Sequence, residues 1–182
     1  ARGTLERLVN LHRHICVCAG WTDPIASDVL DVPNETFLGI HASTLPRNRG
    51  GAPVNWAIIR GETVVGISIF EFVAEVDDGD VFAQTTVPIE PRDDVQTVYQ
   101  RITMAARELA TETLASIASG EAEPTPQDRS KATYLPQRKP EDGIVDWTRP
   151  ASAIVDWVRA LTDPYPGAFT FYSGQRVTVW SA

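Results

Sequence analysis

Residues 37–53 read FLGIHASTLPRNRGGAP, and this stretch indicates the class of fold. The apolar run Phe37–His41 predicts a buried strand. The next ten residues, 42–51, are rich in Pro, Arg and Gly and predict a loop. Pro53 is placed to begin a helix that runs to Arg60. A buried strand followed by a loop and a helix is typical of α/β sheets, in which ligands bind beyond the carboxyl ends of the strands.

Further strands and helices alternate on both sides of this stretch. A buried strand is expected at 14–19, before it. Two β-branched runs, 64–73 and 81–89, resemble a hairpin. Asp93 and Asp94 can cap a helix from Val95 to about Ser119, which Gly120 ends. Because strands and helices alternate in the first half of the chain, we expect an α/β fold with a mostly parallel sheet.

Composition divides the chain into three parts. Residues 1–120 carry the periodic elements and form the expected core. Residues 121–143 contain four prolines and many polar residues, so a linker is expected there. Residues 144–182 predict a short helix at 151–161 and two strands, at 168–172 and 176–180. The chain begins without Met, and we expect part of the core to be missing at this end.

The bulk composition favours a globular protein with small-molecule partners. The net charge is −8, with 16 basic and 24 acidic residues, and no basic stripe of the kind that binds nucleic acid stands out. No apolar run long enough for a membrane span appears and no signal-peptide pattern is recognised, so a cytoplasmic protein is expected. Cys16 and Cys18 are the only cysteines and are expected to be small buried residues of a reduced, cytoplasmic protein. A metal site is not expected, because zinc needs four ligands.

His41 is the candidate reactive residue. It ends a predicted buried strand and opens a polar loop, although a single histidine on a strand is often only structural. The second candidate cluster is Glu75-Val76-Asp77-Asp78-Gly79-Asp80. A solvated turn or a calcium loop are alternatives for it, but a carboxylate from this turn can also orient a histidine and set its basicity.

Other catalytic patterns are not found in the sequence. Ser43 does not lie in a G-x-S-x-G motif, and neither cysteine is near a helix start. The glycine-rich phosphate-binding patterns are missing as well.

Several motifs resemble the formyltransferase family that uses N10-formyltetrahydrofolate. The stretch Gly39–Pro53 is similar to its central motif, roughly N-x-H-x-S-L-L-P-x-x-R-G, and Asp77–Asp80 to its second signature. Residues 134–147 and the string D-P-Y-P-G-A-F at 163–169 resemble its join to the C-terminal domain. The resemblance implies a Rossmann-like core with a short, truncated C-terminal appendage that contains β-strands.

The resemblance also implies roles for individual residues. His41 matches the catalytic histidine and Asp77 the catalytic aspartate, and the loop that holds the folate aligns with Gly20, Trp21, Thr22, Asp23, Pro24 and Ile25. Gly39 departs from the pattern, since the family has an Asn there that stabilises the oxyanion. Losing one such donor costs on the order of 3 kcal/mol in related chemistry.

The expected co-substrate is N10-formyltetrahydrofolate, without a metal, and the expected acceptor is the amino group of a nucleotide-linked sugar. The residues expected to bind this acceptor are Ser43, Arg47, Arg49, Asn55, Tyr134, Arg138 and Lys139. Methionyl-tRNA is an alternative acceptor, which the acidic charge disfavours. Another alternative is a degenerate, non-catalytic binding module, which Gly39 favours. A homodimer is possible by family precedent.

Overall fold

The computed structural model describes residues 15–21, 25, 27–30 and 36–182. The expectations for Thr22, Asp23 and Pro24 therefore lie outside the described residues. In chain order the elements are β1 (Ile15–Cys18), α2 (Ser27–Leu30), β2 (Thr36–His41), β3 (Arg49–Gly50), α3 (Pro53–Ile59), β4 (Val64–Glu71), β5 (Val81–Pro88), α4 (Val95–Ser119), η1 (Arg129–Lys131), β6 (Tyr134–Leu135), η2 (Pro140–Gly143), α5 (Ala151–Leu161), β7 (Ala168–Tyr172) and β8 (Gln175–Val179).

The main sheet has the strand order β1-β2-β4-β5 and is mixed rather than mostly parallel. Only β1 and β2 run parallel, whereas β2 with β4 and β4 with β5 are antiparallel. The expectation of a mostly parallel sheet is therefore wrong. The reason lies after β2, where the seven residues of α3 do not carry the chain back to the start of the sheet, so β4 returns antiparallel. The expected hairpin of β4 and β5 is confirmed.

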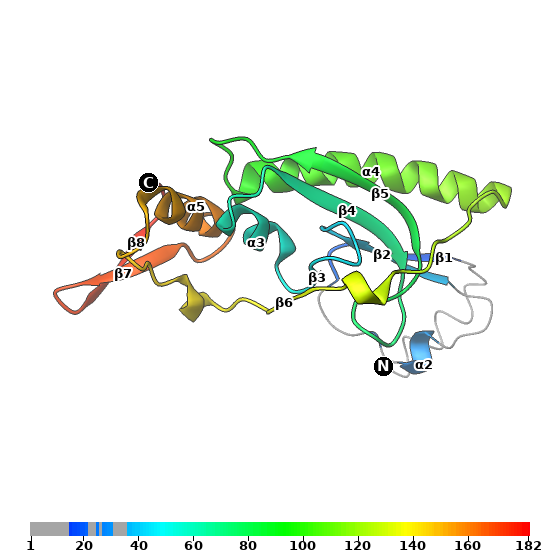
Figure 1. The fold of residues 1–182 in the computed structure, drawn as a ribbon, viewed down its shortest axis with the longest axis horizontal. Coiled ribbons are helices and arrows are strands. Elements are labelled where there is room, and N and C mark those ends of the chain that lie inside the picture. The colour runs from blue at the N-terminus through cyan, green and yellow to red at the C-terminus, as the bar shows by residue number, and fades with distance from the viewer. Residues whose placement is uncertain (1–14, 22–24, 26, 31–35) are drawn as a thin grey trace.

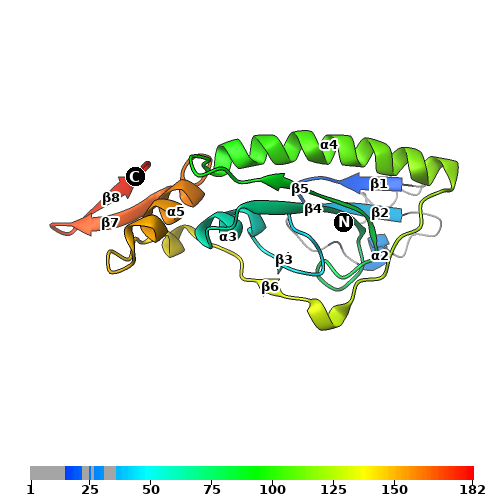
Figure 2. The ribbon, with the colours of Figure 1, turned by 45° about the horizontal axis from the view of Figure 1, so that its top comes forward.

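Helix α4 lies along the sheet and closes the core (Figures 1 and 2). Its start is capped by Asp94, whose side chain accepts a hydrogen bond from the backbone N–H of Thr97 (2.8 Å), and Gly120 ends it in the left-handed conformation at φ 75°. Val95 and Val98 are fully buried, and Ile102 nearly so. They pack in one core with Val54 and Ile58 of α3 and with the inward side chains of β4 and β5.

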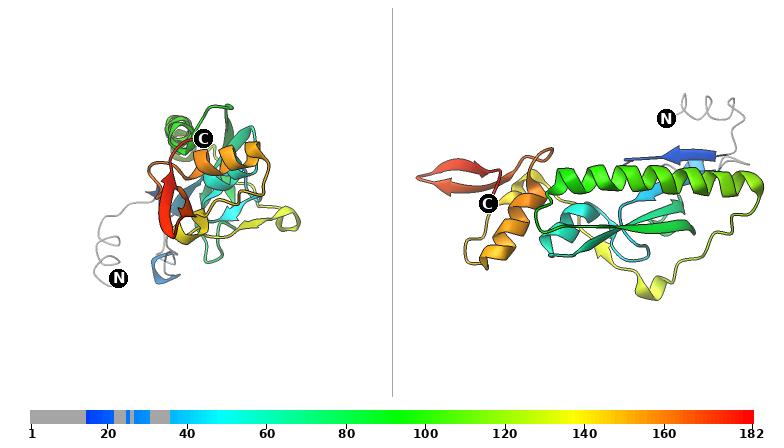
Figure 3. Two further views of the ribbon diagram at one scale, coloured as in Figure 1. Left: turned by 90° about the vertical axis from the view of Figure 1, so that its left-hand side faces the viewer. Right: turned by 90° about the horizontal axis from the view of Figure 1, so that it is seen from above.

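Helix α5 and the hairpin of β7 and β8 lie beyond one end of the sheet (Figures 1 and 3). Asn55 links this part to the core, because its Nδ2 donates a hydrogen bond to the carbonyl oxygen of Ala160 in α5 (2.8 Å). The segment 121–143 connects the two parts and is anchored along its length. Thr125 forms a β-bridge with Val81, and β6 pairs in parallel with β3.

Candidate active site

His41 ends β2 and is held between that strand and the following loop. Its Nε2 lies 2.8 Å from the backbone carbonyl oxygen of Asn48, and its ring meets Phe70 edge-on at 6.4 Å between centroids. A carbonyl oxygen can only accept a hydrogen bond, so Nε2 carries the hydrogen. In the neutral ring, Nδ1 is then the free acceptor. The residue is only 9% exposed, so the ring has a fixed orientation.

Asp77 brings a carboxylate to this free nitrogen. Its Oδ2 lies 3.6 Å from Nδ1 of His41 and accepts a hydrogen bond from the backbone N–H of Gly50 (2.8 Å). Asp77 itself has a left-handed backbone at φ 53°, a strained conformation for a residue other than glycine. The turn between β4 and β5 therefore meets the end of β2, and the expected pairing of imidazole and carboxylate is present in the structure.

A cavity of about 1000 Å³ opens at this pair. Gly20, Trp21 and Ile25 of the expected folate loop line it, together with His41 and Asp77. Ligand sites are typically concave and mostly apolar, with a few polar groups that fix orientation. The volume and the lining are thus compatible with a folate beside an acceptor.

Two tyrosines and two cations line the same cavity on the C-terminal side. The hydroxyl oxygens of Tyr99 and Tyr165 lie 2.9 Å apart, and burial, with a contribution from this hydrogen bond, raises the pKa of Tyr99. Arg138 and Lys139 come from the segment 121–143. Seven residues were expected to bind the acceptor. Within the described chain, three of them line this cavity: Asn55, Arg138 and Lys139.

Arg138 is stacked between two indole rings. Its guanidinium carbon lies 4.9 Å from the ring centroid of Trp56 in α3 and 4.7 Å from that of Trp157 in α5. Desolvation in this position lowers the pKa of Arg138. No sequence pattern indicates this stack, because Trp56, Arg138 and Trp157 are distant from one another along the chain.

The other expected acceptor-binding residues have mainly structural contacts. Ser43 is 3% exposed and donates a hydrogen bond to the carbonyl oxygen of Arg47 (2.7 Å). Arg49 is 1% exposed and forms an ion pair with Asp78. The hydroxyl of Tyr134 accepts a hydrogen bond from Arg49 (3.0 Å). Arg47 is exposed. None of these four residues lines the cavity, and their contacts favour a role in holding the loop.

Gly39 leaves no room for a side chain. It lies opposite Phe70 in the pairing of β2 with β4. A Cβ at Gly39 would lie 2.6 Å from Cε1 of Phe70 and 2.8 Å from Cε2 of Phe72, both too close for real atoms. The two aromatic rings therefore occupy the space in which the Asn of the family pattern would extend.

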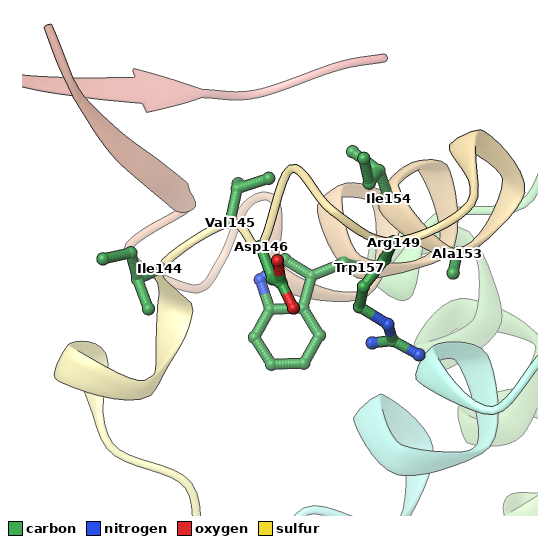
Figure 4. A pocket seen from close by; sticks show the side chains of 7 residues that line it. All are labelled: Ile144, Val145, Asp146, Arg149, Ala153, Ile154 and Trp157. Atoms are coloured by element: carbon green, nitrogen blue, oxygen red, sulfur yellow. The ribbon is translucent and has the colours of Figure 1, made fainter.

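A second, smaller cavity of about 250 Å³ lies in the C-terminal part, around the indole of Trp157 (Figure 4). Figure 4 shows Asp146 and Arg149 beside this ring, with Ile144 and Val145 preceding them in the chain. Oδ1 of Asp146 accepts hydrogen bonds from the backbone and hydroxyl of Thr148, which lower its pKa. This small cavity does not reach the pair of His41 and Asp77.

In the part of the chain that the structure describes, no group of three or more His, Cys, Asp or Glu side chains is arranged to hold a metal ion. Cys16 and Cys18 are free and half-buried. Burial is the larger cause, and the neighbouring Cys16 the smaller one, that raises the pKa of the Cys18 thiol to about 11. No helix in the described part of the chain is long and apolar enough to cross a membrane.

Comparison with known proteins places the chain in a family. The Formyl transferase model matches residues 4–114, more than half of the chain, and the Formyl transferase C-terminal domain model matches residues 138–182. The chain belongs to the formyl transferase family.

Individual relatives agree with this membership. Methionyl-tRNA formyltransferase of Streptococcus pneumoniae serotype 19F (strain G54) is 34% identical over 98% of this chain, and the chain spans 57% of that relative's length. The crystal structure of HypX from Aquifex aeolicus in complex with tetrahydrofolic acid superposes with a TM-score of 0.84 at 26% identity, covering 98% of this chain and 31% of HypX.

A sugar N-formyltransferase from Shewanella sp FDAARGOS_354 has a TM-score of 0.82 at 23% identity, covering 98% of this chain and 73% of that one. At this identity the likeness concerns the fold alone. The mixed α/β architecture is thus that of formyltransferase structures.

Proposed function

We propose that this chain carries the reaction centre of a formyltransferase that moves a formyl group from N10-formyltetrahydrofolate to a primary amine. The observation that carries the proposal is the 3.6 Å separation between His41 Nδ1 and Asp77 Oδ2 at the wall of a cavity large enough for both reactants. Membership of the family supports the reaction class. The HypX complex supports a folate as donor, since that relative binds tetrahydrofolic acid.

The reaction needs one bond made and one broken. The amine nitrogen bonds to the formyl carbon and gives up a proton, while the bond from that carbon to N10 breaks and N10 gains a proton. Negative charge develops on the formyl oxygen, so a protonated His41 can donate to it through Nδ1–H. The Asp77 carboxylate, oriented by Gly50, accepts the proton of the amine. Holding both reactants in one cavity lowers the entropic part of the barrier.

The folate is proposed to lie at the end of the cavity formed by Gly20, Trp21 and Ile25, and the acceptor at the end with Arg138 and Lys139. These two cations at the acceptor end suit a phosphate or diphosphate. The net charge of −8 disfavours a long polyanion, since proteins that bind nucleic acid usually carry a basic surface. A nucleotide-linked amino sugar is therefore the preferred acceptor, in a protein that we place in the cytoplasm.

Methionyl-tRNA is the second candidate acceptor. It is favoured by the 34% identity to methionyl-tRNA formyltransferase of Streptococcus pneumoniae over 98% of this chain. A formyl-transfer assay with N10-formyltetrahydrofolate tests both, with one arm of amino-sugar nucleotides and one of charged initiator tRNA. We expect product in the first arm. Product in the second arm alone would overturn the sugar proposal, and folate binding without product in either arm would favour the non-catalytic module.

A further inference from the structure

Gln127 reaches from the segment 121–143 to the turn that carries Asp77. Its Nε2 donates hydrogen bonds to the backbone carbonyl oxygens of Asp77 (2.8 Å) and Gly79 (2.6 Å). Its Oε1 accepts from Nη2 of Arg49 at 2.7 Å and from Nε of Arg49 at 3.2 Å. Both N–H donors and the acceptor of this one side chain are thus engaged, and no sequence motif had singled it out.

The turn that Gln127 holds has little freedom to relax. Gly79 packs against β4 so closely that a Cβ on it would lie 1.8 Å from the carbonyl oxygen of Glu71. Asp78, with a side chain 6% exposed, is paired with the buried Arg49 and, through Oδ2, with Arg129 (2.7 Å). Asp77 keeps its positive φ of 53° between these anchors. A strained residue persists only where its surroundings hold it, and here they include the two bonds from Gln127.

Gln127 is itself held in place from both sides. Two residues earlier, Thr125 exchanges two backbone hydrogen bonds with Val81, at 2.9 and 2.8 Å. One residue later, the side chain of Asp128 accepts from the backbone N–H of Ser130 and begins η1. The position of the Gln127 amide therefore follows from the path of the segment, and the segment in turn fixes the turn at Asp77.

We propose that Gln127 is a positioning residue for Asp77: its amide holds the backbone of the 77–79 turn so that the Asp77 carboxylate faces His41. This inference rests on the proposed function, because it assigns Gln127 to the same reaction. It acts only through Asp77, since Gln127 does not line the cavity. Reaction centres lose rate steeply when a reacting group moves by about 1 Å, so a displaced carboxylate should affect turnover more than substrate binding.

Gln127→Glu replaces the N–H donor with a carboxylate oxygen, which the carbonyl oxygens of Asp77 and Gly79 repel. The variant keeps the length of the side chain and an acceptor for Arg49, but it has no N–H to give to the two carbonyl oxygens. We expect kcat to fall about tenfold or more, with the KM of the folate donor within about twofold of the parent value. Gln100→Glu, the same change at an exposed position of α4, is the control and should leave kcat unchanged.

A double-variant cycle with Asp77→Asn separates positioning from a general structural defect. If Gln127 acts through Asp77, Gln127→Glu should change the residual kcat of Asp77→Asn by less than about twofold. An equal fall in both backgrounds, or an unchanged kcat in the parent background, would overturn the inference.

Hydrogen–deuterium exchange gives a readout that does not depend on activity. Amides of the turn at 74–80 should exchange faster in Gln127→Glu than in Gln100→Glu. Equal exchange in the two variants would overturn the inference, whether or not the wild-type chain transfers a formyl group. Faster exchange in Gln127→Glu, together with no formyl transfer by the wild-type chain, would count against the proposed function alone.

Discussion

Gly39 faces Phe70 across the antiparallel pair of β2 and β4, and the space beside its Cα is filled by that ring and by Phe72. The position lies two residues before His41 on the same strand. Where the family pattern has an Asn, this chain therefore has two aromatic rings packed against Gly39, which leave no room for an amide side chain.

The first prediction concerns restoring the amide. Gly39→Asn should fail to raise turnover and should lower the free energy of unfolding by about 1–3 kcal/mol, because overpacking forces the two rings out of place. Urea unfolding and the formyl-transfer rate are the measurements, with Gly39→Ala as the variant that adds only the Cβ. A faster enzyme with unchanged stability would mean that the rings move aside freely.

The second prediction concerns the reacting pair. His41→Ala and Asp77→Asn should each lower kcat by about 10²-fold or more, because each removes a group that moves a proton in the transition state. Circular dichroism should show the fold intact in both variants. Glu112→Gln, an exposed carboxylate on α4, is the matched control for charge removal. Near-normal turnover in both His41→Ala and Asp77→Asn would refute the assignment.

The third prediction concerns Arg138 between Trp56 and Trp157. Arg138→Lys keeps a positive charge but loses the planar group that stacks on both rings, at 4.9 and 4.7 Å. We expect the KM for the acceptor to rise by about tenfold, which corresponds to about 1.4 kcal/mol of lost interaction. The KM for the folate donor should change little. Arg92→Lys, at an exposed position, is the control. Equal rises for both substrates would argue against an acceptor site there.

The fourth prediction concerns pH and Asp93, which lies just before α4. Hydrogen bonds from Arg101 at 2.6 and 3.2 Å, helped by the backbone N–H of Glu90, lower the pKa of the Asp93 carboxyl. A lowered pKa in the folded state means that the ionised carboxylate contributes stability above about pH 4, the ordinary value for Asp, and that this contribution is lost as the pH falls through the folded pKa.

Asp93→Asn should therefore unfold at a lower urea concentration than the parent protein at neutral pH, and the difference should shrink as the pH falls below about 4. Urea midpoints measured at several pH values test this, with Glu108→Gln on the exposed face of α4 as control. A difference that stays constant with pH would show that the ion pair does not contribute.

What the sequence determined is the local structure around His41 and along α4. An apolar run followed by a Pro, Arg and Gly loop and a proline at the helix start predicts β2, the loop and α3, since these signals act between neighbouring residues. Asp94 and Gly120 bound α4 for the same reason. Only the tertiary structure decided the antiparallel return of β4, the filling of the space at Gly39 by Phe70 and Phe72, and the hold of Gln127 on the turn at Asp77. These features depend on which residues distant in the chain pack together, and local propensity carries no information on that.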